Sequence, residues 1–400
     1  MTCALKIVWL APFAYAPKAT VSARMMPMAS ALCRQGHTLT VLVPPYDNPA
    51  DSGRVWERDG VRVENMRLPG LSISGYTMLS LAWQMARRAR QLRPDLIHVF
   101  KPVGPGALAM WLLRHRLPNF PIVVDNDDWE GAGGWLDVNP YPALQKRALA
   151  WQERWCLRQA RAVTCASHAL MERTRLLAGE KPMALLPNGP DRSLRAVVAQ
   201  AESRRDELRD AFGWRNARVL IYAGTVPLNH DMDIAVRAIG AIQAGIPGLK
   251  WAIIATGAGL PSLQAAIRRA GLHSLTEHHG FMPHDHLVER LVAADIALYP
   301  YRDSNINRAK CSGKVIDYMA CGKPMVVSDV GMNREYLEHG ISGLLTAPGD
   351  AEAFASALAQ LARDPLWAGS LGRAAQARLW ERYGWDGRVA ALQAFYQAAL

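Results

Sequence analysis

The chain has 400 residues, half of them apolar, and a formal net charge of +11 at pH 7. This length exceeds the size at which a single hydrophobic core remains efficient, so we expect two domains. No apolar run approaches the roughly 18 residues of a membrane-spanning helix, which argues against a transmembrane protein. The positive charge favours an anionic partner, and nucleic acid, an acidic membrane face and a phosphorylated substrate all fit.

The chain begins with a predicted strand at residues 7–10, without the basic region and long apolar segment of a signal peptide. Six cysteines without metal-ligand spacing occur at Cys3, Cys33, Cys156, Cys165, Cys311 and Cys321. In a chain of this length we expect buried thiols rather than disulfides, which suits a reducing compartment. A cytoplasmic location is therefore predicted.

Residues 6–43 read as strand, loop, helix and strand, with Gly36 at the predicted helix end. This βαβ pattern indicates a parallel sheet. The loop at residues 12–22 lacks a G-x-G-x-x-G motif, which argues against a dinucleotide site. A further strand is predicted at residues 61–63.

Residues 76–92 form a predicted amphipathic helix with a basic cluster at its end, made of Arg87, Arg88, Arg90 and Arg93. One interpretation is a solvated helix face. The other is docking on acidic phospholipid beside a lipid-linked acceptor, because basic amphipathic helices bind anionic interfaces. The sequence leaves both open.

A predicted buried strand at residues 121–124 is followed by a cluster of acids, Asp125, Asp127, Asp128 and Glu130. Ligands of open α/β sheets gather at the carboxyl ends of strands. These acids could cap the next segment, hold a metal ion or act on a substrate. Since no histidine or further ligand set accompanies them, we predict no metal site and favour a catalytic or sugar-orienting role for Asp127 or Asp128.

The P-N-G-P-D segment at residues 187–191 predicts a rigid turn, so we place a domain boundary near residue 190. The second half then begins again with a strand at 219–223, the turn Gly224-Thr225 and a helix at about 231–243. Apolar residues at helical spacing between 378 and 400 predict a packed terminal helix.

A predicted helix after Ser312 has the features of an anion site. Ser312 is a good N-cap, and Gly313 has no side chain to block the free N–H groups of the first turn. Lys310 and Lys314 add positive charge on either side. Asp317 lies one turn further on the same face, where it could accept hydrogen bonds from a sugar diol. Phosphate and ribose together indicate a nucleotide.

These segments resemble the GT-B-fold glycosyltransferases of family 4, or glycosyl transferases group 1, which mostly retain anomeric configuration. The shared motifs are R-x-G-H, R-P-D-hydrophobic-H, V-T-x-x-S, P-N-G-x-D and G-x-P, at residues 34–37, 93–98, 163–167, 187–191 and 322–324. The resemblance implies an α/β protein with two Rossmann-like, doubly wound parallel-sheet domains facing across a cleft. They are an acceptor-side domain at 1–190, a nucleotide-sugar-binding domain at 191–377, and a helix at 378–400 that crosses back to the first.

The resemblance also implies a donor site. Asp317 matches the second acid of the family's pair, whereas Ala309 stands where the first acid would be, so Asp303 or the N-terminal half is expected to replace it. Relatives place an arginine and a lysine after the glycine that matches Gly224, and this chain has neither. The predicted donor-binding residues are Gly224, Thr225, Phe281, Met282, Arg308, Lys310, Ser312, Gly313, Lys314 and Asp317.

The predicted activity is transfer of a sugar from a nucleoside diphosphate sugar to a hydroxyl acceptor, which is a glycan, a lipid-linked sugar or a small molecule. Retention is implied by the family alone, and no cofactor is expected. The alternatives are a nucleotide-sugar epimerase and a non-catalytic relative that only binds. Nucleic acid is not expected as a partner, because the chain lacks a basic motif with interleaved aromatic residues. Peripheral contact with the inner face of an anionic membrane remains an alternative to a purely cytoplasmic location.

Overall fold

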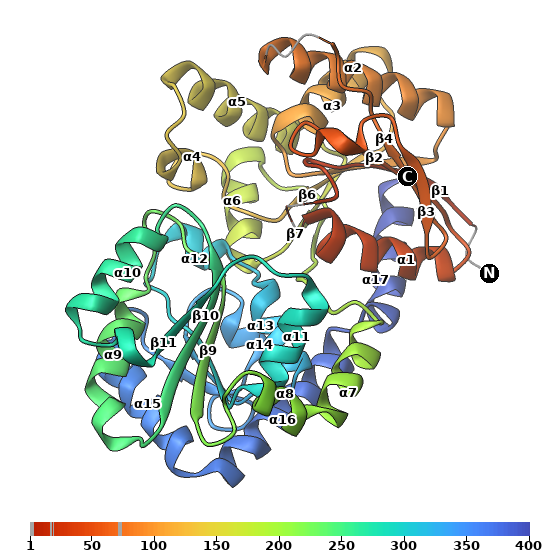
Figure 1. Cartoon of the computed structure of the whole chain (residues 1–400). Helices are drawn as coiled ribbons and strands as arrows, with labels where there is room; N and C mark the ends of the chain where they lie inside the picture. Colours follow the sequence, from red (N-terminus) through yellow and green to blue (C-terminus); the bar gives the residue numbers. More distant parts are fainter. Residues whose placement is uncertain (1–3, 17, 19, 71–73) are drawn as a thin grey trace. The chain divides into compact units, whose positions relative to one another are not determined.

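The computed structural model describes residues 4–16, 18, 20–70 and 74–400 (Figure 1). Cys3, and Pro17 and Ala19 of the N-terminal loop, lie outside the described residues. The chain divides into two compact units. The first comprises Met1–Gly189, Ala309–Cys311 and Trp385–Leu400, and the second comprises Pro190–Arg308 and Ser312–Gly384.

The first unit is built on an eight-stranded sheet with the order β3-β4-β2-β1-β5-β6-β7-β8. Every neighbouring pair is parallel except β3 and β4. The first strand, β1, lies between β2 and β5, so the direction of winding reverses there. The strands are β1 Lys6–Leu10, β2 Thr38–Val43, β3 Val55–Arg58, β4 Val61–Asn65, β5 Leu96–Phe100, β6 Ile122–Asn126, β7 Ala162–Cys165 and β8 Met183–Leu185.

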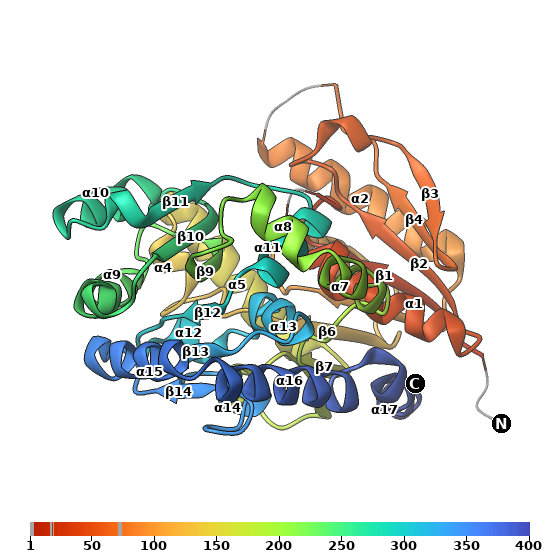
Figure 2. The same ribbon diagram turned by 60° about the horizontal axis from the view of Figure 1, so that its bottom comes forward.

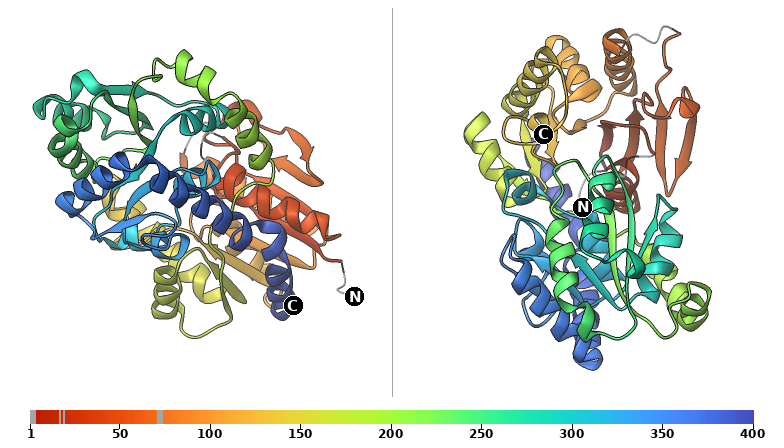
Figure 3. Two further views of the ribbon diagram at one scale, coloured as in Figure 1. Left: turned by 90° about the horizontal axis from the view of Figure 1, so that it is seen from below. Right: turned by 60° about the vertical axis from the view of Figure 1, so that its left-hand side comes forward.

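Helices cover this sheet, which explains why most residues of its central strands are apolar. α3 packs against α2 and α5, whereas α17 packs against α1, as Figure 3 also shows. Tyr396 of α17 places its hydroxyl 2.6 Å from Nδ1 of His98, in the core of the unit. The helices are α1 Met26–Arg34, preceded by a π-helical turn at Thr20–Met25, α2 Ser74–Leu92, α3 Gly104–Arg116, α4 Trp135–Val138, α5 Ala143–Gln159, α6 His168–Ala178 and α17 Trp385–Ala399, with a 3₁₀ turn at Pro49–Asp51.

The second unit has six parallel strands in the order β11-β10-β9-β12-β13-β14. The earliest strand is again central, and later strands extend to either side, which is the doubly wound arrangement. α15 packs on β12, β13 and β14 beside α9 and α16 (Figure 2). The strands are β9 Arg218–Thr225, β10 Leu249–Thr256, β11 Thr276–His279, β12 Ile296–Tyr299, β13 Met325–Ser328 and β14 Leu344–Thr346.

The helices of the second unit alternate with its strands. The terminal helix was predicted to begin at residue 378, but α16 continues through that residue to Arg382. The chain returns to the first unit at Trp385. The helices are α7 Leu194–Ser203, α8 Arg205–Ala211, α9 Asp233–Ile242, α10 Leu260–Arg269, α11 His284–Ala293, α12 Asn305–Ala309, α13 Gly313–Ala320, α14 Asn333–Tyr336, α15 Ala351–Arg363 and α16 Pro365–Arg382, with 3₁₀ turns at Gln243–Gly245 and His273–Leu275.

The predicted fold class is confirmed, because both units are doubly wound α/β domains with mostly parallel sheets. The five described cysteines are free thiols, and all except Cys33 are buried. Among the described residues, no helix is both long enough and apolar enough to cross a bilayer.

Candidate active site

In the second unit, α13 begins as the sequence predicts. The Ser312 hydroxyl caps the helix by accepting a hydrogen bond from the Lys314 backbone N–H at 3.2 Å, and it donates to the Tyr299 hydroxyl at 2.5 Å. The second contact ties the start of α13 to the end of β12. A Cβ added to Gly313 would meet no atom within 4 Å, so the backbone there is open to an approaching group. The positive end of the helix dipole therefore lies accessible at Gly313.

Asp317 has two basic partners one turn into α13. Its Oδ2 accepts from Lys314 Nζ at 3.1 Å, and its Oδ1 lies 3.0 Å from Nε2 of His284 at the start of α11. Burial would raise the pKa of Asp317, but Lys314 and His284 outweigh it and lower the pKa to about 2. The Asp317 carboxylate in turn raises the pKa of His284.

The prediction had missed His284. Both oxygens of Asp317 already have partners, so a ribose diol would have to share or displace them. One sequence signal could have pointed to this histidine, because it directly follows the β11 turn that contains Phe281 and Met282. In a doubly wound sheet, that turn lies at the same edge as the start of α13.

Four other predicted donor residues of the second unit lie at the ends of strands or just after them. Phe281 follows β11, and its side chain is 76% exposed, whereas Met282 is half-buried. Gly224 and Thr225 end β9, where the Tyr222 hydroxyl donates to the Thr225 carbonyl at 3.2 Å. A Cβ at residue 224 would lie 2.9 Å from that hydroxyl oxygen, so a larger residue there would have to displace the Tyr222 side chain.

The remaining basic candidates have other partners in the structure. Arg308 binds Asp303 through two hydrogen bonds, at 2.5 and 2.7 Å, so the charges of these two predicted residues offset each other. Ala309 is fully buried, and Lys310 groups with the first unit, where its ammonium lies 5.7 Å from the centre of the Trp135 ring. Within the second unit, Lys314 is the predicted cation beside the helix start.

In the first unit, the predicted catalytic acids surround a lysine that the sequence reasoning had missed. Lys101 follows β5, and its buried ammonium lies 3.3 Å from Asp127, 2.5 Å from Asp128 and 2.7 Å from Glu130. Burial would lower the pKa of Lys101, but the three carboxylates raise it well above its ordinary value. The position of Lys101 directly after β5 could have pointed to it, because β5 and β6 are neighbours and their carboxyl ends meet at one edge of the sheet.

Asp127 differs from its neighbours. Its side chain is nine-tenths buried, and although Oδ1 faces the Lys101 ammonium, it forms no hydrogen bond with a described residue. Burial raises the pKa of Asp127 to about 7, against the opposing effect of Lys101 and with help from the charges of Asp128 and Asp125. Asp127 can therefore take up or release a proton near neutral pH.

Asp125, the first acid of the predicted cluster, is structural. It is fully buried, binds the Arg24 guanidinium at 2.7 and 2.9 Å, and accepts from the Thr164 hydroxyl at 2.6 Å. The oxygens of the other three acids lie within 4.8 Å of one another, which is close enough for a metal ion. In this structure the Lys101 ammonium is the cation that contacts all three.

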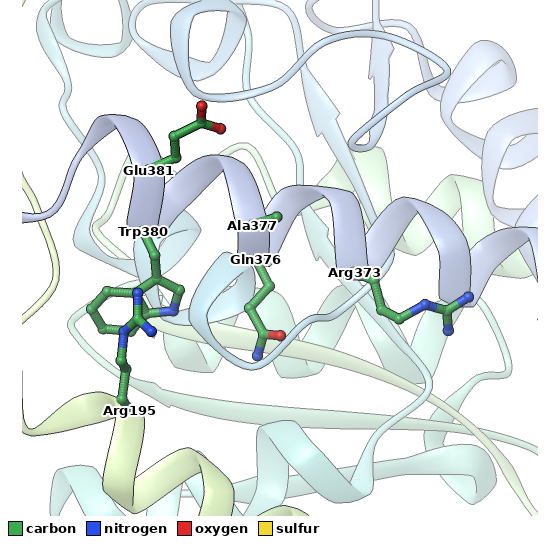
Figure 4. Close-up of a pocket in the computed structure, with 6 residues that line it drawn as sticks. All are labelled: Arg195, Arg373, Gln376, Ala377, Trp380 and Glu381. Atoms are coloured by element: carbon green, nitrogen blue, oxygen red, sulfur yellow. The ribbon is translucent and has the colours of Figure 1, made fainter.

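A hollow of about 520 Å³ in the second unit lies between α7 and α16 (Figure 4). The Arg195 guanidinium lies over the Trp380 ring, 4.4 Å from its centre, and so already covers one face of the indole. None of the predicted donor residues lines the hollow. Its lining residues are Arg195, Arg373, Gln376, Ala377, Trp380 and Glu381.

Comparison with known proteins places one recognisable domain in each unit. Residues 20–189 match the glycosyl transferase 4-like domain, and residues 217–364 match the glycosyl transferases group 1 domain. Together the two matches extend over most of the chain.

Individual proteins resemble the chain over most of its length. It is 24% identical over 349 residues to alpha-D-kanosaminyltransferase of Streptomyces kanamyceticus, covering 82% of this chain and 86% of that protein. It is 28% identical over 346 residues to 2-deoxystreptamine N-acetyl-D-glucosaminyltransferase of Streptomyces fradiae, covering 82% and 80%. The solved structure of Anabaena HepE in complex with UDP-glucose aligns with a TM-score of 0.74 at 18% identity, over 99% of this chain and 100% of that one.

Proposed function

Because the chain belongs to the glycosyl transferases group 1 family of GT-B glycosyltransferases, we propose that it transfers a sugar from a nucleoside diphosphate sugar to a hydroxyl group. The acceptor is a glycan, a lipid-linked sugar or a small molecule. The observation that carries this proposal is the open start of α13 at Gly313, followed directly in the sequence by Lys314. Backbone N–H groups, a helix dipole and a lysine together form a site for a diphosphate.

Three observations support a nucleotide-sugar donor on the second unit. The complex of HepE with UDP-glucose shows that a protein of this fold binds such a donor. The exposed ring of Phe281, at the end of β11, is available to the base. Asp317 carries a carboxylate for the ribose, shared with His284 and Lys314.

In the proposed reaction, the bond between the anomeric carbon and the diphosphate oxygen breaks, and a bond from that carbon to the acceptor oxygen forms. Lys314 and the start of α13 stabilise the charge that develops on the departing diphosphate. The proton of the acceptor hydroxyl passes to a carboxylate. Asp127 suits this role because its pKa is about 7, while Lys101 holds Asp128 in place. Retention of configuration is proposed from the resemblance alone.

The donor is a substrate in this proposal, and no cofactor or metal ion takes part. We propose a cytoplasmic location. Contact with an anionic membrane is a separate proposal, which rests on the outer helices of the first unit.

The proposal is tested by measuring the binding of nucleoside diphosphates to the whole chain and to its Lys314→Ala variant. A thermal-shift screen identifies the preferred base, because a ligand that binds the native state raises its stability. Loss of a charge-assisted contact of roughly 1.5–3 kcal/mol should weaken binding about 10- to 100-fold. Lys250→Ala is the matched control, since Lys250 lies in the same unit and is paired with Glu277.

Equal affinity of the Lys314→Ala variant and the wild type for the nucleoside diphosphate would contradict a diphosphate site at the start of α13. Sugar transfer is then followed with the preferred donor and a panel of hydroxyl acceptors. Release of the nucleotide without any acceptor would favour the epimerase, and binding without turnover would favour a non-catalytic relative.

A further inference from the structure

Three neighbouring helices of the first unit present tryptophan to solvent. α3 packs against α2 on one side and α5 on the other, and Figure 1 shows the three together. Their connections to the parallel strands place them on one face of the sheet, because such crossovers are right-handed. One exposed tryptophan stands on each helix, with 54% of Trp83, 37% of Trp111 and 48% of Trp151 accessible. We call the exposed side chains of α2, α3 and α5 the three-helix surface.

The exposed side of α2 is a single stripe. Tyr76, Leu79, Trp83, Arg87 and Arg90 follow one another at intervals of three or four residues, and all are exposed. Such spacing places them on one side of the helix. The stripe is therefore apolar and aromatic in the first half of the helix and basic in the second.

The exposed side of α5 repeats this pattern. Leu144, Arg147, Trp151, Arg154 and Arg158 are exposed at similar intervals. Leu144 is 78% accessible, which is unusual for a leucine in the first turn of a long helix that packs against its neighbours. Both helices thus expose leucine, tryptophan and arginine along a line.

The charge of the three helices has one sign. Their sequences contain nine lysines and arginines and a single acid, Glu153, which is buried and paired with Arg173 at 2.7 Å. The whole chain carries a net charge of +11, so most of its excess lies on these helices. Arg88 is paired with Glu64, but among the described residues no carboxylate forms an ion pair with Arg87, Arg90 or Arg147.

We infer that the three-helix surface docks on an anionic lipid membrane, with the helices lying along the interface. Tryptophan and tyrosine favour the headgroup level of a bilayer, leucine favours the acyl boundary, and arginine is attracted to acidic headgroups. A second copy of the chain would bring two positively charged surfaces together. Nucleic acid would form ion pairs with the arginines, but it would bury little of the exposed leucine side chains. The inference does not depend on the proposed donor or acceptor.

The experiment is co-sedimentation of the whole chain with phosphatidylcholine vesicles, with and without phosphatidylglycerol. Binding should require phosphatidylglycerol and weaken as salt is added. Each arginine near the surface contributes about 1 kcal/mol, or roughly fivefold, so Arg87→Ala with Arg90→Ala should lower partitioning roughly 25-fold. Trp83→Ala with Trp151→Ala should lower it roughly tenfold, through lost apolar burial.

Arg268→Ala with Arg269→Ala is the matched control, because it removes the same charge from exposed positions of α10 in the second unit. An equal loss in this control, or equal binding to neutral and anionic vesicles, would overturn the inference. Light scattering of the vesicle-free protein gives the other decisive outcome. A dimer that the Trp83→Ala and Trp151→Ala changes dissociate would assign the surface to a second copy instead.

Discussion

The two carboxylate clusters of the molecule show how the same burial leads to opposite acidities. Asp127 and Asp317 are both buried at the edge of a parallel sheet, yet the pKa of Asp127 is raised to about 7 and that of Asp317 is lowered to about 2. In the first unit, three carboxylates share the Lys101 ammonium. In the second, one carboxylate is shared by Lys314 and His284. Burial raises the pKa of both carboxyls, and only at Asp317, where two bases face one acid, is that effect reversed.

The largest expected effect of this difference is on catalysis. Asp127→Asn removes a carboxylate that can accept a proton near neutral pH, so sugar transfer should fall roughly 10²- to 10⁴-fold. Kinetics with a saturating nucleotide-sugar donor measure this. Asp128→Asn is the comparison, because Asp128 is held by Lys101 and should lose less activity. Full activity in both variants would show that this carboxylate cluster takes no part in the reaction.

The Asp127→Asn variant should also differ from the wild type in the pH dependence of its stability. A carboxyl group whose folded-state pKa is raised adds stability at low pH, and this is lost as the pH rises from its ordinary value of about 4 to about 7. Asp127→Asn abolishes that loss. The free energy of unfolding of the variant should therefore rise relative to that of the wild type across this range, by roughly 4 kcal/mol. Denaturation by urea at several pH values tests the trend, and a gap independent of pH would contradict it.

The next largest effect is expected on stability, when Lys101, the base shared by the three carboxylates, is removed. Lys101→Met leaves three clustered carboxylates without their cation, which typically costs roughly 3–5 kcal/mol when such a partner is buried. The deficit should shrink as the pH falls, because the carboxylates then become protonated. Lys250→Met, which breaks the more exposed pair with Glu277, should cost less than about 1 kcal/mol.

The smallest expected effect concerns His284. The Asp317 carboxylate raises the pKa of His284, so its charge is present at low pH and is lost as the pH rises through a value above its ordinary one. Nucleoside diphosphate affinity should therefore fall a fewfold between about pH 6 and about pH 8. His284→Gln should flatten that profile, and titration calorimetry at both pH values measures it. An unchanged slope in the variant would assign the pH dependence to another group.

The sequence predicted features that depend on neighbours along the chain. Ser312 caps α13 because its hydroxyl needs only the N–H two residues ahead, and the strands predicted at 61–63 and 219–223 follow from their apolar residues. Partners from other elements were missed. Lys101 and His284 reach the predicted acids only because β5 lies beside β6 and β11 lies in the same sheet as β12, and local sequence does not determine strand order.

The predicted charges illustrate the same limit. Arg308 was predicted to bind the donor and Asp303 to replace the first acid of the family's pair, and the structure joins them to each other. Their five-residue separation across the start of α12 allows this contact, but a residue pattern alone does not favour it over a ligand. The distribution of arginines over α2, α3 and α5 likewise emerges only when the three helices are placed side by side.

The position of α17 in the core of the first unit has a consequence for synthesis on the ribosome. Val389, Leu392 and Tyr396 fill that core together with residues from the opening strands, but they are translated after the entire second unit. The amino-terminal half must therefore wait, with apolar surface uncovered, while about two hundred more residues emerge. Until α17 is made, this uncovered surface is open to aggregation. A premature stop codon just before Trp385 would leave the earliest-made unit unfinished.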